Sequence, residues 1–243
     1  MTPPLAALVA EAARLVPGWQ GRVVEAGAAA PPWHATERLA AVRGHGATRH
    51  PEAGAAFAAL RGWGRLVWQP LYLAVFAVHA GRTRVDLDRL SIGVAADGEV
   101  QGYRWAAHAT PAAGEAERLR TAAAQAAAGI ATLLPRWQAC APLHAKAARR
   151  TCADCVLAAV LALRRRRRWT AARTRAVGAR WLDALALHGE SGFFSYRDCA
   201  GDEALGLERK VCCLDFRCRD AQRCATCPRR PLPERIACLN ARR

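Results

Sequence analysis

The 243-residue sequence contains very little lysine and no apolar run of transmembrane length. Lys146 and Lys210 are the only lysines, so arginine supplies almost all of the positive charge. The most apolar stretch, residues 66–80, is shorter than the roughly 20 residues that a membrane-spanning helix needs, and Gln69 and Pro70 interrupt it. The sequence therefore predicts no membrane-spanning helix and favours a buried helix in this stretch.

The features of a secretory signal peptide are also missing from the first 16 residues. That stretch has no basic region ahead of its apolar residues, and Glu11 and Arg14 interrupt it, whereas a signal peptide combines a basic start with a continuous apolar segment. We therefore expect a cytoplasmic protein. The chain contains ten cysteines, and in a reducing compartment such thiols serve more often as metal ligands than as disulfides.

The formal net charge of +16 favours acidic partners and says nothing about the fold. Nucleic acid, an anionic ligand, an acidic redox protein and peripheral contact with the inner face of the membrane are all open. The run Arg164–Arg168 is the strongest sign of nucleic-acid binding. On a helix, however, five consecutive side chains point all around the axis, so we disfavour nucleic acid and expect a solvated helix end.

The spacing of apolar residues predicts a mainly helical chain. Phe57, Leu60 and Val67, for example, recur at helical intervals. We expect Pro70 to kink or restart the helix that contains it, and Pro135 to end another. Helices are expected over residues 3–16, 36–42, 55–80, 111–134, 137–168 and 170–187.

One short β element interrupts these helices. Residues 85–105 contain alternating apolar and polar side chains around an Asp-Gly pair at 97–98, which is typical of two strands joined by a tight turn. From Glu190 onward glycine and proline become frequent, and we expect loops. The predicted fold class is α+β, with a mainly α-helical body and a short β-hairpin or small sheet over residues 1–205, followed by a cysteine-rich C-terminal segment over residues 206–243.

Four cysteines in that segment form the most specific motif of the chain. Cys212, Cys213, Cys224 and Cys227 are spaced as C-C-x10-C-x2-C. A C-x-x-C pair is typical of two thiolates on one metal. Adjacent side chains tend to point to different sides of the chain, so a vicinal pair suits a wide two-iron cluster better than a single tetrahedral ion. We predict that the four cysteines bind a 2Fe-2S cluster, and a zinc site is the alternative.

This motif resembles the cluster-binding sequence of the FhuF-like siderophore-iron reductases. Arg209 and Lys210 before the vicinal pair, and a Gly-x-Ser segment at 189–191, are similar as well, and residues 60–230 resemble the body of that family more loosely. The resemblance implies that the four cysteines ligate a 2Fe-2S cluster and that the protein reduces ferric siderophores. Two features depart from the pattern: Cys218 lies between the two pairs, and the spacer contains no glycine.

Ferric-siderophore reduction requires only a one-electron carrier. Siderophore oxygens are hard donors that hold Fe(III) far more strongly than Fe(II), so one added electron releases the iron. The expected enzyme is a cytoplasmic ferric-siderophore oxidoreductase that receives electrons from a ferredoxin or flavoprotein, with no catalytic residue beyond the cluster. The alternative from another class is a non-enzymatic four-cysteine zinc protein that binds nucleic acid.

Positive charge surrounds the cysteine motif. Cations next to a cluster raise its reduction potential and attract an acidic electron donor, although a solvated basic tail explains the same residues. The cations are Arg209, Lys210, Arg217, Arg219, Arg223, Arg229 and Arg230.

A second C-x-x-C sequence is formed by Cys152 and Cys155 near an expected helix start. A helix start lowers the pKa of a thiol, which would suit a redox dithiol. No βαβ pattern precedes the pair, as a thioredoxin-like site requires, so we favour packing in the core.

Overall fold

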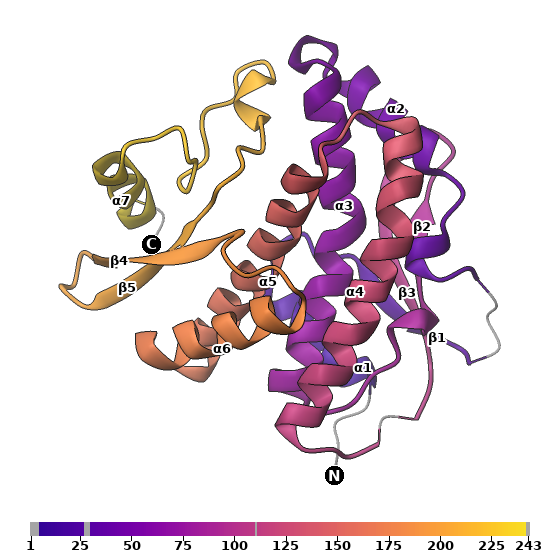
Figure 1. The fold of residues 1–243 in the computed structure, drawn as a ribbon, viewed down its shortest axis with the longest axis horizontal. Helices are drawn as coiled ribbons and strands as arrows, with labels where there is room; N and C mark the ends of the chain where they lie inside the picture. Colours follow the sequence, from indigo (N-terminus) through magenta and orange to yellow (C-terminus); the bar gives the residue numbers. More distant parts are fainter. Residues whose placement is uncertain (1–4, 27–29, 110, 242–243) are drawn as a thin grey trace.

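The computed structural model describes residues 5–26, 30–109 and 111–241, which form a helical bundle flanked by two small sheets (Figure 1). The helices are α1 (Leu5–Leu15), α2 (Leu39–Arg49), α3 (Ala55–Phe76), α4 (Glu115–Cys140), α5 (Ala145–Arg167), α6 (Ala171–Ala184) and α7 (Leu232–Asn240). The strands are β1 (Gly21–Val24), β2 (Leu90–Val94), β3 (Val100–Ala106), β4 (Gly192–Arg197) and β5 (Glu203–Glu208). The predicted fold class, mainly helical with small sheets, is confirmed.

Helix α3 is the centre of the bundle, and α2, α4 and α5 pack around it (Figure 1). Gly62 lets α4 approach closely, because a Cβ atom at this position would lie 2.5 Å from the Trp137 ring. On the side of α5, Trp63 Nε1 donates a hydrogen bond to the Ala148 carbonyl at 3.1 Å. Both indole rings are fully buried, so two large aromatic side chains fix the spacing of the three helices.

Pro70 lies inside α3, which continues through it to Phe76, as the expected helix over residues 55–80 requires. A proline inside a helix leaves the carbonyl four residues earlier without its usual donor, and here that carbonyl belongs to Leu66. The Tyr103 hydroxyl, from β3, donates to the Leu66 oxygen at 2.5 Å. The neighbouring sheet therefore replaces the missing hydrogen bond, and α3 continues.

Pro135 likewise lies inside α4 rather than at its end. The carbonyl that loses its donor belongs to Ala131, which is exposed, so water can solvate it. Leu133 and Trp137, on either side of Pro135, are fully buried. We infer that their burial outweighs the cost of the proline, and the expected boundary at residue 135 is wrong.

The first sheet has the order β1–β3–β2. β2 and β3 are antiparallel, which confirms the predicted hairpin, and β1 adds parallel to β3. Gly98 in the connecting turn has φ +89°, and a Cβ there would lie 1.9 Å from the Ala41 carbonyl, so the turn packs against α2. The parallel strand β1 was not expected, because parallel partners lie far apart in sequence.

The expectation of loops after Glu190 is wrong in part. β4 and β5 pair as an antiparallel hairpin, and α7 follows the cysteines. The hairpin and the C-terminal segment lie together beside the bundle in Figure 1.

Thr170 caps α6 by accepting from the Arg173 amide at 3.2 Å, but α6 ends at Ala184, earlier than expected. The short helix expected at 36–42 is α2, which begins at Leu39.

Helix α1 begins the described part of the chain. The helix expected over residues 3–16 is α1, and residues 3 and 4 lie outside the described part of the chain. Within the described ranges, no helix combines the length and apolar character needed to cross a membrane.

A buried histidine follows α3, in the π-helical turn Ala77–Gly81. Trp181 Nε1 donates to His79 Nε2 at 2.9 Å, so the ring proton resides on Nδ1, 4.0 Å from a Glu115 carboxylate oxygen. Burial lowers the pKa of His79 to about 4, although Glu115 opposes the shift. The imidazole is therefore neutral in the folded protein at neutral pH.

This low pKa predicts a loss of stability in mild acid. Between pH 6.5 and pH 4 the unfolded chain protonates His79 and the folded chain does not, so the free energy of unfolding falls as the pH falls, by about 3 kcal/mol over the window. Urea unfolding across this range measures the effect. His79→Gln keeps an acceptor for Trp181 but cannot titrate, so it should lose that part of the pH dependence. Equal slopes in both proteins would contradict the assignment.

Candidate metal centre

The cysteine segment begins where the β4–β5 hairpin returns to α5. Two main-chain anchors hold its start: Arg150 Nη1 donates to the Lys210 carbonyl at 2.9 Å, and Lys210 Nζ donates to the Gly189 carbonyl at 2.6 Å. These bonds place residue 210 against α5 just before the vicinal cysteines. The hairpin thus delivers the motif to the side of the bundle.

The C-x-x-C sequence forms the tight turn that the motif predicts. The Cys227 amide donates to the Cys224 carbonyl at 3.1 Å, and the Arg230 amide donates to the Cys227 carbonyl at 3.0 Å. Upstream, Leu214 adopts a left-handed conformation with φ +63° directly after the vicinal pair. This reversal turns the chain toward the C-x-x-C turn.

Two thiol–thiol contacts connect the two halves of the motif. The Sγ atoms of Cys212 and Cys227 are 3.8 Å apart, and those of Cys213 and Cys224 are 4.0 Å apart. Each vicinal cysteine therefore faces one member of the C-x-x-C pair. The expectation that the two C-x-x-C thiolates share one metal differs from this arrangement, because the turn points Cys224 and Cys227 toward different partners.

The separations within each pair suit two thiolates on one metal ion. Tetrahedral ligands at about 2.3 Å from a metal lie about 3.8 Å from each other. A single four-thiolate ion would require all four sulfurs to converge on one point, yet among the residues that the structure describes no three His, Cys, Asp or Glu side chains are placed to hold one ion. The contacts therefore define two two-thiolate positions rather than one four-thiolate position.

The thiols within the motif differ in acidity. The contact with Cys224 lowers the pKa of Cys213 to about 6, and the same contact raises the pKa of Cys224. Burial raises the pKa of Cys212. Arg209 Nη1 also donates to the Cys224 sulfur at 3.5 Å, so a cation touches one of the four sulfurs directly.

A buried ion pair fixes that cation. Arg209 Nε donates to Asp154 Oδ2 at 2.8 Å, and the Ser191 hydroxyl donates to Asp154 Oδ1 at 2.6 Å. The Asp154 side chain is only 8% exposed. Burial raises the pKa of Asp154, and the charge of Arg209 opposes this shift. Burial also disfavours the charged form of Arg209, but the attraction and hydrogen bond to Asp154 together outweigh it and raise the pKa of Arg209. We infer that both groups are ionised, since arginine keeps its proton throughout the accessible range.

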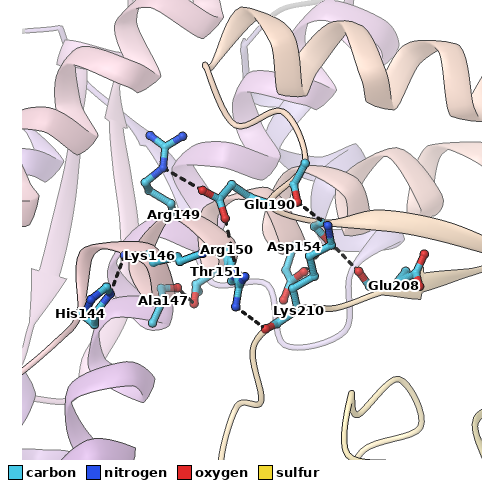
Figure 2. A network of polar contacts seen from close by, with 12 residues as sticks. His144, Lys146, Ala147, Arg149, Arg150, Thr151, Asp154, Glu190, Glu208 and Lys210 are labelled. Atoms are coloured by element: carbon cyan, nitrogen blue, oxygen red, sulfur yellow. Dashed lines mark hydrogen bonds and ion pairs between the residues drawn. The ribbon is translucent and has the colours of Figure 1, made fainter. Parts of the chain in front are cut away.

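A second ion-pair group ties the same stretch of chain to α5. Figure 2 shows Glu190 between Arg149 and Arg150, with N–O distances of 3.1 and 3.4 Å, and the link from Arg150 onward to Lys210. Within the Gly-x-Ser segment at 189–191, the Gly189 carbonyl accepts from Lys210 and the Ser191 hydroxyl donates to Asp154. This segment therefore helps to anchor the start of the cysteine segment.

Sequence reasoning missed Asp154 and Glu190. The available signal was a charged residue inside the Cys152–Cys155 sequence, directly before the apolar run 156–163, because a buried carboxylate needs a partner. Its partner, Arg209, lies 55 residues later, and sequence spacing does not indicate such a contact.

The remaining cysteines do not join the four. Cys152 is fully buried in the core and Cys155 packs against it, and burial raises the pKa of both thiols, that of Cys152 to about 12, so core packing is the better interpretation. Cys218 lies in the same segment, but neither thiol–thiol contact involves it.

The five consecutive arginines at the end of α5 are largely used within the fold. Arg164 donates to the Glu203 carbonyl at 2.8 Å, Arg167 donates to the Ala80 carbonyl at 3.0 Å, and Arg166 pairs with Glu11 at 3.2 Å. Residues 165–168 are exposed, as expected of a solvated helix end, although Arg166 and Arg167 also make contacts within the fold. They do not form a free basic stripe.

Exposed cations cover the outside of the cysteine segment. Arg217, Arg219, Arg223 and Arg229 are exposed. The guanidinium carbons of Arg223 and Arg229 lie 5.7 and 5.5 Å from the centre of the Phe216 ring, within cation–π range. The ring holds two of these charges in place next to the thiols.

Comparison with known proteins adds no identification. No family model matches the chain, and neither a curated protein nor a solved structure matches it.

Proposed function

We propose that this protein is a ferric-siderophore reductase that binds a 2Fe-2S cluster through Cys212, Cys213, Cys224 and Cys227. The observation that carries the proposal is the arrangement of the four sulfurs as two pairs, 3.8 and 4.0 Å apart. Each pair offers one iron two thiolates, and the two pairs lie on one short segment. The resemblance of the motif to the FhuF-like reductases supplies the substrate class.

The cluster, when bound, would supply one electron at a time to Fe(III) in the substrate. The chain's own residues set the conditions for that transfer. Arg209 donates to the Cys224 sulfur, and a hydrogen bond and a positive charge at a ligand sulfur favour the reduced, more negative state. Asp154 holds Arg209 in this position. Transfer of one electron to the substrate would reduce its Fe(III) to Fe(II). Hard oxygen donors bind Fe(II) weakly, so the iron is released.

The electron donor in this proposal is an acidic protein of the ferredoxin or flavoprotein type, acting in the cytoplasm. The exposed arginines around Phe216 lie on the same segment as the thiols. Charge complementarity of this kind accelerates the encounter of redox partners more than it tightens the complex. The rate at which the donor reduces the cluster should therefore fall as ionic strength rises.

The alternative, a zinc protein that binds nucleic acid, has less support. A single zinc ion needs four converging thiolates, whereas the sulfurs are arranged in two pairs. Three of the five consecutive arginines are occupied by contacts within the fold.

Anaerobic purification followed by metal analysis tests the proposal. We expect a red-brown protein with about two irons and two acid-labile sulfides per chain, whose visible absorption is bleached by dithionite. Stopped-flow mixing of the reduced protein with a ferric siderophore should restore the oxidised spectrum. Stoichiometric zinc without sulfide would contradict the cluster, and a reduced protein that is not reoxidised would contradict the reductase.

A further inference from the structure

A cavity of about 480 Å³ lies beside the cysteine segment. Its volume is within the range of small-molecule sites. Its walls come from α3, α5, the first sheet with the chain before it, and the segment that holds the cysteines. The lining residues that matter here are Arg61, Arg65, Trp68, Glu99, Arg209 and Cys213. Cys213, a predicted cluster ligand, therefore forms part of the cavity wall, and a molecule in the cavity can contact it.

Arginine is the most frequent charged residue in the lining of this cavity. Three arginines line it against the single carboxylate of Glu99. Asp154 neutralises Arg209 at 2.8 Å, and Asp215 lies 3.5 Å from Arg61. Arg65 has no such close partner: among the residues described, no hydrogen bond or ion pair of its guanidinium is recorded.

Arg65 is partly buried, and burial together with the nearby charge of Arg61 lowers its pKa. Arg61 and Arg65 are four residues apart on α3, so both lie on one face of the helix. A neighbouring cavity of about 280 Å³ shares these two arginines and adds Arg49 and Arg219. An anion placed beside Arg65 would therefore lie near the guanidinium groups of Arg61 and Arg49, whose charge Glu99 and Asp215 offset only in part.

An aromatic side chain completes the site. The Trp68 ring lies edge-on to Trp19 and to Tyr72, with ring centroids 5.6 Å apart in each case. These contacts fix the indole that lines the cavity. A fixed aromatic ring next to two cations suits a ligand that combines flat apolar groups with negative charge.

We propose that this cavity binds the ferric siderophore and that the chelate is anionic, a catecholate or carboxylate complex rather than a neutral trihydroxamate. This inference rests on the proposed function. Arg61 and Arg65 bind the negative charge of the chelate, and Cys213 lies on the wall that the substrate contacts. One electron passes to the chelated iron, which changes from Fe(III) to Fe(II), and the ferredoxin or flavoprotein donor replaces that electron; no bond to the protein forms or breaks.

Binding of gallium(III) complexes to the purified holoprotein tests the inference without electron transfer, because Ga(III) mimics Fe(III) but is not reduced. The probes are the trianionic gallium complex of enterobactin, the anionic gallium complex of rhizoferrin and the neutral gallium complex of ferrichrome. We expect both anionic complexes to bind more tightly than the neutral one. Calorimetry or tryptophan fluorescence measures the dissociation constants.

Arg65→Gln should weaken the anionic complexes about 10-fold or more, since a hydrogen bond to a charged group is lost, and should leave the neutral complex unchanged. Arg65→Lys should restore part of the affinity, because it keeps the charge. Arg120→Gln, at an exposed position of α4, is the matched control and should bind all three probes like the wild type. Far-UV circular dichroism verifies that each variant is folded.

The inference is overturned if Arg65→Gln binds the anionic complexes as tightly as the wild type, or if the neutral complex binds best to the wild type. These outcomes differ from a failure of the proposed function. Reduction of ferric siderophore that is indifferent to Arg65 would remove the cavity assignment and leave the reductase in place. Arg65-dependent gallium binding without any electron transfer would do the reverse.

Discussion

Replacing Cys213 with serine will give a folded protein that lacks the visible absorption of the cluster and reduces ferric siderophore more than about 100-fold more slowly. Even outer-shell changes at metal sites cost roughly 10–100-fold in affinity or activity, and Cys213 would be a direct ligand. Its sulfur lies 4.0 Å from that of Cys224, so the change leaves Cys224 without its partner. A serine hydroxyl stays protonated at neutral pH, whereas a thiolate is the species that binds iron.

Cys218→Ser is the control for this experiment. Cys218 lies in the same segment, five residues after Cys213, but takes no part in either thiol–thiol contact. Iron and sulfide content, visible absorption and EPR of the reduced state should all match the wild type. A protein that keeps its cluster as Cys213→Ser and loses it as Cys218→Ser would show that the ligand set is wrong.

The cysteine motif could be predicted from the sequence because its members are local. The C-x-x-C turn follows from spacing alone, and the hairpin of β2 and β3 follows from alternation around an Asp-Gly turn. The pairing of sulfurs could not be predicted: the chain takes a left-handed conformation at Leu214 directly after the vicinal pair, and leucine gives no sign of it.

Contacts between distant parts of the chain explain the other differences. Pro70 was expected to kink or restart a helix; α3 continues through it, and the Tyr103 hydroxyl replaces the lost donor. Likewise, Arg61 and Arg65 read in sequence as the polar side of a helix. Only their position in one cavity with Cys213 makes these arginines part of the proposed substrate site.

The buried pair between Asp154 and Arg209 leads to a large expected effect on stability. Arg209→Met should lower the free energy of unfolding by about 3–5 kcal/mol, because it leaves the buried Asp154 carboxylate without a counter-charge. The Asp154 side chain is 8% exposed and that of Arg209 16%, so water cannot fully replace the lost partner. Urea unfolding of the reduced apoprotein, followed by far-UV circular dichroism, measures the change.

A double variant separates the charge from the packing. Asp154→Leu combined with Arg209→Met should recover most of the lost stability, since apolar residues of similar volume often replace a buried ion pair at little cost, and the Ser191 hydroxyl keeps the Glu208 carbonyl as an acceptor at 3.3 Å. Both variants should still lower the reduction potential of the cluster, because each removes the cation that donates to the Cys224 sulfur. If Arg209→Met costs less than about 1 kcal/mol and leaves the potential unchanged, the ion pair neither anchors the cysteine segment nor tunes its metal centre.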